Sequence, residues 1–231
     1  KTYPIVDHSG IFINPTGTDL HVGTKHFVTR KIQVEPTKFE RIEPYIHEVD
    51  AVIFNFGNID DIDPEAIRLA KQNSKALIYV DVHRKPFGAD KEGRIYVRGW
   101  PGWENYLKFA DHVQMNRQEA EALFGEKMKT VGDVAANAQK IISCGARHVI
   151  VTLGSRGALL AYGQRPCRYL IARALPAKVV DTTGCGDAFA AGYLFSLLKG
   201  GSLFDSLKWG NLMGAVNCEF MGYIKGIKRE E

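Results

Sequence analysis

The chain has 231 residues, of which 45% are hydrophobic, 24% charged and 10% aromatic, a composition that is ordinary for one globular domain with a substantial core. This composition excludes a disordered chain and a fibre. The formal net charge is +4, but the lysines and arginines are scattered rather than gathered into a stripe, so the charge gives no indication of nucleic-acid binding.

The N-terminal segment differs from the rest of the chain. Turn-forming residues separate short extended stretches there: Gly10, Pro15, Gly17 and Gly23. We interpret residues 1–35 as part of a small β flap, or lid, and residues 36–231 as an α/β core. The chain begins at Lys1, and its opening is unlike the first strand of an α/β domain. We therefore expect that N-terminal sequence is missing.

From Val49 onward, short β-branched runs alternate with helical stretches, which is the pattern of βαβ units in a parallel sheet. Right-handed crossovers would stack the helices on that sheet. A loop with Pro86, Gly88, Gly99, Pro101 and Gly102 interrupts the pattern. The elements predicted up to this point and just beyond it are a strand at 51–57, a helix at 63–72, a strand at 76–81, a helix near 104–110 and a strand at 112–115.

The middle of the chain continues the alternation. Asn116 and Thr130 each open a helix, and a strand at 147–152 leads into a turn at 154–157. The strands that follow, at 158–162 and 167–172, are expected to be antiparallel, since an antiparallel edge on a parallel sheet is common.

The last third of the chain is predicted to be helical. Phe189, Tyr193 and Leu197 recur at the spacing of one helix face. Gly200 and Gly201 should end this helix. Ser202 with Asp205 resembles an N-cap pair, and the helix that it starts contains Asn211 and runs towards Met221.

The strongest chemical signal is the segment 181–187, DTTGCGD, between strand-like residues 178–180 and a helix that begins near Gly184. Its glycines let several backbone N–H groups point at one spot, where the helix dipole also favours negative charge. Fixed donors of this kind stabilise the charge on a phosphoryl group in transit. Asp187 could take the proton from an attacking hydroxyl. The structural alternative is a tight turn in which Asp187 only complements the helix dipole.

Residues 181–194, DTTGCGDAFAAGYL, resemble the closing signature of the ribokinase-like (PfkB) carbohydrate kinase family, D-T-x-G-A-G-D followed by an apolar helix. Cys185 stands where alanine is usual, and cysteine is small enough to preserve the turn. The resemblance implies a three-layer α/β fold with a mostly parallel central sheet and a small β flap. It also implies that Asp187 is the catalytic base and that Gly184, Cys185 and Gly186 supply the anion hole.

The same resemblance suggests metal sites. Asp181 and Thr183 resemble residues that hold a monovalent cation, such as K⁺, in many members of the family. Asn116 and Glu119 match the N-x-x-E motif, whose members organise hydrated Mg²⁺ near the phosphates, so Glu119 would act through water. A capping box uses the same two residue types at the same spacing, so the pair could also be purely structural.

Further positions resemble nucleotide contacts of the family. Residues 152–157 are similar to the T-x-G-x-x-G turn that borders the ribose and phosphates, through Thr152, Gly154 and Gly157. Asn211 falls where many members line the adenine pocket, although a solvent-facing asparagine is equally expected there. Asp81 and Arg84 resemble a D-x-x-x-R element with shorter spacing, and a helix cap or surface ion pair would explain them as well. We leave both outside the catalytic set.

The function implied by the resemblance is transfer of the γ-phosphate of ATP, with Mg²⁺, to a hydroxyl group of a small sugar or sugar-like molecule. A nucleoside kinase of the same superfamily, or a non-catalytic relative that keeps the fold, are the alternatives. P-loop, protein-kinase, GxSxG and HExxH motifs are absent from the sequence. The family's N-terminal acceptor-binding residues are also absent, so the acceptor stays open. Flaps often pair between subunits in this family, which suggests a homodimer.

Cysteine usage and hydropathy suggest a cellular location. The four cysteines form no CxxC pair and no metal-binding spacing with histidine: Cys144, Cys167, Cys185 and Cys218. No apolar run is long enough for a membrane span, and no signal peptide opens the chain. We expect a reduced, soluble, cytoplasmic protein that has neither nucleic acid nor a membrane as a partner.

Overall fold

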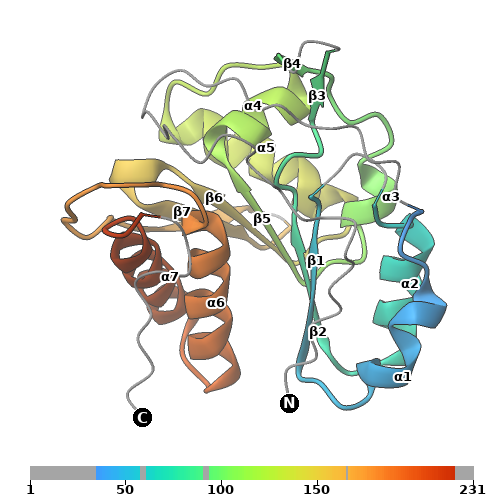
Figure 1. The fold of residues 1–231 in the computed structure, drawn as a ribbon. Coiled ribbons are helices and arrows are strands. Elements are labelled where there is room, and N and C mark those ends of the chain that lie inside the picture. Colours follow the sequence, from blue (N-terminus) through green and yellow to red (C-terminus); the bar gives the residue numbers. More distant parts are fainter. Residues whose placement is uncertain (1–34, 58–60, 91–93, 165, 222–231) are drawn as a thin grey trace.

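The computed structural model describes residues 35–57, 61–90, 94–164 and 166–221, and its centre is a six-stranded sheet (Figure 1). The strand order is β1-β2-β5-β6-β7-β8. The first four of these are mutually parallel, whereas β7 is antiparallel to β6 and to β8, so the predicted mixed sheet is confirmed. The strands are β1 (Ala51–Asn55), β2 (Leu77–Asp81), β5 (His112–Asn116), β6 (His148–Thr152), β7 (Ala158–Tyr162) and β8 (Arg168–Ala172).

Helices cover both faces of this sheet, which confirms the expected three layers (Figure 1). One apolar core joins one sheet face to the helices α1 to α5, and a second core joins the other face to α6 and α7. The bounds are η2 (Phe39–Arg41), α1 (Glu43–Ile46), α2 (Pro64–Asn73), α3 (Glu104–Leu107), α4 (Arg117–Phe124), α5 (Val131–Cys144), η3 (Gly154–Arg156), α6 (Cys185–Leu198) and α7 (Leu203–Asn217).

The two cores explain why the central strands are apolar along their whole length. Successive side chains of a strand point to opposite faces of the sheet. In β6, Val149 and Val151 belong to the core shared with α5, whereas Ile150 belongs to the core shared with α6. A strand that is covered on both faces therefore needs apolar residues at odd and even positions, and it shows no alternation of polar and apolar residues.

Side-chain caps fix the starts of the helices that the sequence predicts. Asp63 accepts a hydrogen bond from the backbone of Glu65 at 2.9 Å, and Thr130 accepts one from Asp133 at 3.1 Å. Ser202 caps α7 by accepting from the backbone N–H of Asp205 at 3.1 Å. Each cap satisfies a donor that the first turn of a helix leaves without a partner. The predicted N-cap pair at the start of α7 is confirmed.

Four predicted elements are wrong or too long. The strand predicted at 51–57 ends at Asn55, and the helix predicted near 104–110 ends at Leu107. Residues 178–180 do not form a strand. The N–H groups of Val180 and Asp181 both donate to the carbonyl of Cys218 at the end of α7, so they are not available for a sheet ladder. The last helix ends at Asn217 rather than near Met221.

A second, two-stranded sheet lies where a loop was expected. Strand β3 (Phe87–Ala89) pairs with β4 (Ile95–Val97) in antiparallel fashion. Sequence reasoning missed it because the glycine and proline residues nearby suggested only a loop. The predicted β flap at 1–35 falls, apart from residue 35, outside the residues that the structure describes, so it stays a prediction.

The buried carboxylate of Asp111 connects β2 to Lys71 on α2 and to Arg147 just before β6. Asp111 is 4% exposed and accepts from Lys71 Nζ at 2.6 Å and from the backbone N–H of Ile78 at 2.9 Å. Arg147 Nη1 lies 3.3 Å from Asp111 Oδ1. Burial alone would raise the pKa of Asp111, but the hydrogen bonds from Ile78, Lys71 and Arg147 prevail and lower it.

We expect Asp111→Asn to lower the free energy of unfolding at pH 7 by about 2 kcal/mol, because hydrogen bonds to a charged group are worth about 1.5–3 kcal/mol. The folded-state pKa lies below the unfolded value, so this contribution is present above about pH 4 and fades as the pH falls further. Urea unfolding at neutral and at acidic pH measures both effects. The control is Glu126→Gln, at an exposed pair with Lys140. An equal loss at both pH values would contradict the argument.

Candidate active site

Polar side chains gather at one edge of the main sheet. Asn55, Asp81, Asn116 and Thr152 are the last residues of β1, β2, β5 and β6. Because these strands are parallel, the four residues share the carboxyl edge, and the sheet register pairs Asn55 with Asp81 and Asn116 with Thr152. Ligands of open α/β sheets bind outside this edge. The carboxyl edge is therefore the place to look for a site.

The glycine turn (residues 184–186) forms the start of α6. Gly184 is the N-cap residue and has φ 77°, a left-handed conformation that glycine adopts without strain. In the part of the chain that the structure describes, no protein group accepts a hydrogen bond from the N–H of Gly186 or of Asp187. Such unpaired donors at a helix N-terminus bind anions well. The turn has the geometry of an anion hole.

Asp187 connects the glycine turn to the sheet. Its Oδ1 accepts a hydrogen bond from Asn55 Nδ2 at 2.8 Å, across 132 positions of sequence. Asp187 is exposed. A carboxylate that is held at one oxygen and open to solvent therefore lies next to the unpaired N–H groups of the turn, and its role as a base stays a prediction.

A second carboxyl group lies buried beneath the turn. Asp81 is 4% exposed, and its oxygens accept from the backbone of His83 at 3.1 Å and from Gln114 Nε2 at 2.8 Å. Burial, followed by the charge of Asp187, raises the pKa of Asp81 to about 7. The surface ion pair considered for Asp81 is therefore wrong.

His83, with φ 43°, is the one non-glycine residue with positive φ in the described part of the chain.

Asn116 and Glu119 form the capping box of α4. Glu119 N–H donates to Asn116 Oδ1 at 2.9 Å, and Asn116 N–H donates to Glu119 Oε2 at 2.7 Å. Burial, then the charges of Asp81 and Asp187, raises the pKa of Glu119 to about 8. The capping box is formed, yet the carboxyl group of Glu119 also interacts electrostatically with Asp81 and Asp187 at the carboxyl edge. A cation would relieve this concentration of negative charge.

The turn after β6 meets β8 and α7. Gly157 lies so close to the end of β8 that a Cβ atom there would be 2.0 Å from the carbonyl oxygen of Ala172. Asn211 Nδ2 donates to the same carbonyl at 2.9 Å and to that of Arg173 at 3.1 Å. Asn211 is buried, so a solvent-facing role is wrong. The structure thus brings Gly157 and Asn211, with the turn that begins at Gly154, to one place.

The segment before the glycine turn is held by the end of α7. Asp181 is buried, and its Oδ1 accepts from the N–H of Thr183 at 2.9 Å. Asn217 Nδ2 donates to the carbonyl of Thr183 at 2.9 Å. The monovalent-cation site at Asp181 and Thr183 stays a prediction. Among the described residues, no group of three His, Cys, Asp or Glu side chains is placed to hold a metal ion by itself.

Sequence reasoning missed two residues of this site and set aside a third. Asn55 and Gln114 were not singled out, and Asp81 was left outside the catalytic set. Gln114 is a polar residue inside a buried apolar strand, which is itself a signal, because a buried amide needs hydrogen-bond partners. Asn55 offered a weaker signal as the polar end of an apolar run.

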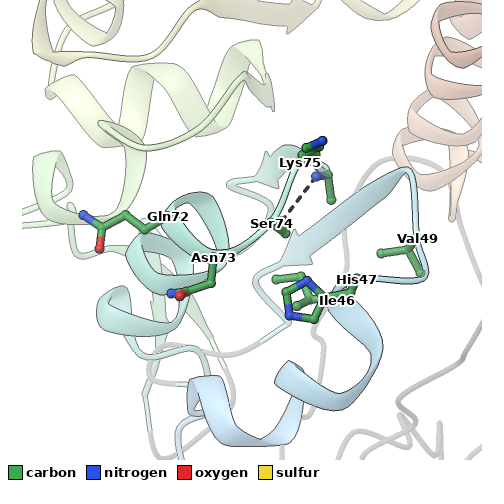
Figure 2. A pocket seen from close by; sticks show the side chains of 8 residues that line it. Ile46, His47, Val49, Gln72, Asn73, Ser74 and Lys75 are labelled. Carbon is green, nitrogen blue, oxygen red and sulfur yellow. Dashed lines mark hydrogen bonds between the residues drawn. The ribbon is translucent and has the colours of Figure 1, made fainter.

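A cavity of about 380 Å³ lies elsewhere, and Figure 2 shows the side chains around it. Its lining includes Val49, just before β1, and Ala76, just before β2. It therefore opens at the amino edge of the sheet, opposite to the glycine turn. No residue of the predicted site lines it, so it is not the candidate active site.

The three layers, with a glycine turn that starts α6 at the carboxyl edge of a mixed sheet, define the class of this chain as a three-layer α/β protein. This chain belongs to the PfkB family: the model of the pfkB family carbohydrate kinases matches residues 16–229. An uncharacterized sugar kinase of Archaeoglobus fulgidus is 37% identical over 132 residues, which are 57% of this chain and 49% of that protein. The 2-dehydro-3-deoxygluconokinase of Escherichia coli K12 is 30% identical over 159 residues, 68% of this chain and 48% of the relative.

Solved structures agree on the fold. The Arabidopsis thaliana ribokinase complexed with ribose and ATP superimposes with a TM-score of 0.68 at 23% identity, over 84% of this chain and 57% of that one. The ribokinase-like fold class is thereby confirmed.

The chain spans about half the length of the curated relatives it matches. No helix in the described segments is long and apolar enough to cross a membrane.

Proposed function

We propose that this chain contains the catalytic site of an ATP-dependent kinase that phosphorylates a hydroxyl group of a small sugar or sugar-like molecule. The observation behind this proposal is the hydrogen bond that holds Asp187 beside the unpaired N–H groups of the glycine turn. Membership of a carbohydrate kinase family supports the substrate class. A named relative that binds both ribose and ATP supports the donor.

Asp187 acts as the general base in this proposal. Asn55 occupies Oδ1 and fixes the carboxylate plane, which leaves Oδ2 to accept the proton of the acceptor hydroxyl. Loss of that proton makes the oxygen nucleophilic as it attacks phosphorus. Because Asp187 is exposed, an acceptor can reach it directly.

The glycine turn stabilises the transferring group. ATP supplies the phosphoryl group, and Mg²⁺ neutralises part of its charge when bound. The N–H donors of Gly186 and Asp187 lie at the positive end of α6 and face charge that develops on the phosphoryl oxygens. Cys185, the residue between Gly184 and Gly186, keeps its own N–H engaged with the carbonyl of Thr182 at 3.2 Å. Cys185 therefore shapes the turn and does not offer its own N–H to the phosphoryl group.

The remaining predicted residues surround the donor. Asn116 and Glu119 would orient water molecules around Mg²⁺, as hard oxygen ligands suit this ion. Asp181 and Thr183 would hold a monovalent cation below the turn. The nucleoside would lie along residues 152–157 and Asn211, which the structure brings together at the end of β8.

ATP turnover against a panel of acceptors tests the proposal. The panel includes pentoses, hexoses, sugar acids, inositols and nucleosides, with Mg²⁺ and K⁺ present, and acceptor-dependent ADP release is measured. We expect one sugar-like compound to be strongly preferred. A preference for nucleosides would move the chain to the nucleoside kinases. No acceptor-dependent release across the panel would favour a non-catalytic relative and contradict the proposal.

A further inference from the structure

We propose that Gln114 is a positioning residue, which fixes the peptide group between Gly186 and Asp187 and so aims the anion-binding donor and the base. This inference rests on the proposed function. The observation behind it is a buried polar network that connects two strands, β2 and β5, with the first turn of α6, and which the catalytic proposal does not use.

Gln114 lies in the middle of β5 and is 2% exposed. A buried amide is costly unless its donors and acceptor are all paired. Tyr79 donates its hydroxyl proton to Gln114 Oε1 at 2.5 Å. Gln114 Nε2 donates to Asp81 Oδ2 at 2.8 Å and to the carbonyl oxygen of Gly186 at 3.0 Å. Every polar atom of the side chain is therefore engaged.

The hydrogen bond to Gly186 has a direct consequence for the turn. The carbonyl of Gly186 and the N–H of Asp187 belong to one planar, trans peptide group, so they point in opposite directions. When Gln114 holds the carbonyl towards the sheet, the N–H of Asp187 is directed away from it. That N–H is one of the donors without a protein acceptor in the described part of the chain. Gln114 thus sets the direction of a donor that it does not touch.

The partners of Gln114 also fix which way its amide faces. Tyr79 is fully buried and donates, whereas the carbonyl of Gly186 and the ionised carboxylate of Asp81 accept. A flipped amide would place Oε1 against two acceptor oxygens and lose two hydrogen bonds. The side chain therefore has one orientation. Tyr79 and Asp81 hold the amide of Gln114 in place, and Gln114 in turn holds the carbonyl of Gly186.

Gln114→Met tests the positioning role, because methionine has a similar length and cannot hydrogen-bond to Gly186. We expect kcat to fall by about 10- to 100-fold, the size of effect known for residues that orient a metal ligand through a hydrogen bond, with little change in KM for ATP. The matched control is Gln139→Met on α5, where the amide bonds Ser143 and the carbonyl of Gln164. A kcat for Gln114→Met equal to that of the control would overturn the proposal.

Gln114→Glu provides a readout that a merely structural residue would not give. A carboxyl group at this position donates to Gly186 only when it is protonated, and burial beside Asp81 favours the protonated form. We expect the ratio of variant to wild-type kcat to rise as the pH is lowered from about 8 to about 6. A flat ratio would count against the role, and this holds even if Gln114→Met fails to fold.

Binding of ADP with Mg²⁺ and aluminium fluoride, which mimics the transferring phosphoryl group, gives a test without an acceptor. We expect Gln114→Met to weaken binding of this mixture about 10-fold or more while the affinity for ADP alone is kept. If the wild type neither turns over an acceptor nor binds the mimic, the proposed function fails. If the wild type does both and Gln114→Met does so equally well, only the positioning role fails.

Discussion

We expect Asp187→Asn to lower kcat by about 10²- to 10⁴-fold and to leave ATP binding close to that of the wild type, because removal of a general base typically costs this much. The substitution is informative because it preserves the local geometry. The carbonyl oxygen of asparagine can accept the hydrogen bond that Asn55 donates to Oδ1 of Asp187 at 2.8 Å. The glycine turn keeps its position, and what is lost is the proton acceptor.

Steady-state kinetics with the preferred acceptor, together with ATP binding by calorimetry, measures this result. Asp205→Asn is the matched control, since Asp205 occupies the first turn of α7 as Asp187 occupies the first turn of α6. We expect the control to keep the wild-type kcat. An unchanged kcat for Asp187→Asn would remove the base from the mechanism, and weakened ATP binding would indicate a role in holding the donor.

Local patterns predicted those parts of the site that lie within one stretch of sequence. The glycine turn, its Asp187 and the capping box at Asn116 and Glu119 are each contained in a few consecutive residues. The strands of the parallel sheet were also recognised, because burial on both faces requires continuous apolar runs. What these stretches share is that their geometry depends on neighbours along the chain.

The missed residues depend on contacts between distant segments. Asn55 meets Asp187 across 132 positions, and Gln114 meets Gly186 across 72. No periodicity encodes such contacts. The wrong strand at 178–180 has the same origin. Its β-branched residues favour extended backbone, but the carbonyl of Cys218, far along the chain, takes the N–H groups that a sheet would need.

The structure also changes how alternatives at one motif are judged. Asn116 and Glu119 were open to a structural or a metal-organising interpretation. Both hydrogen bonds of the capping box are formed, and the carboxyl group of Glu119 is buried near other acids, which raises its pKa. A cap orders the carboxyl group that a hydrated ion would then use. The two roles therefore support each other.

We expect Gly157→Ala to lower the free energy of unfolding by about 2–6 kcal/mol, the sum of a conformational and a steric cost. Gly157 has φ 97° and ψ −136°, a region almost restricted to glycine, and occupation by alanine costs about 1–3 kcal/mol. Its Cβ would also lie 2.0 Å from the carbonyl oxygen of Ala172 and 2.6 Å from the N of Ala174. Backbone must move to relieve such overlap, which adds about 1–3 kcal/mol.

Gly154→Ala separates conformational strain from steric overlap. Gly154 has φ 61°, yet a Cβ there would meet nothing within 4 Å. Alanine should cost only the left-handed penalty, about 1–2 kcal/mol. Urea unfolding of both variants measures the difference, and equal losses would refute the steric argument.

Because Asn211 donates to the carbonyl that Gly157 approaches, Gly157→Ala should also displace Asn211 and weaken ATP binding. Gly154→Ala leaves that hydrogen bond in place.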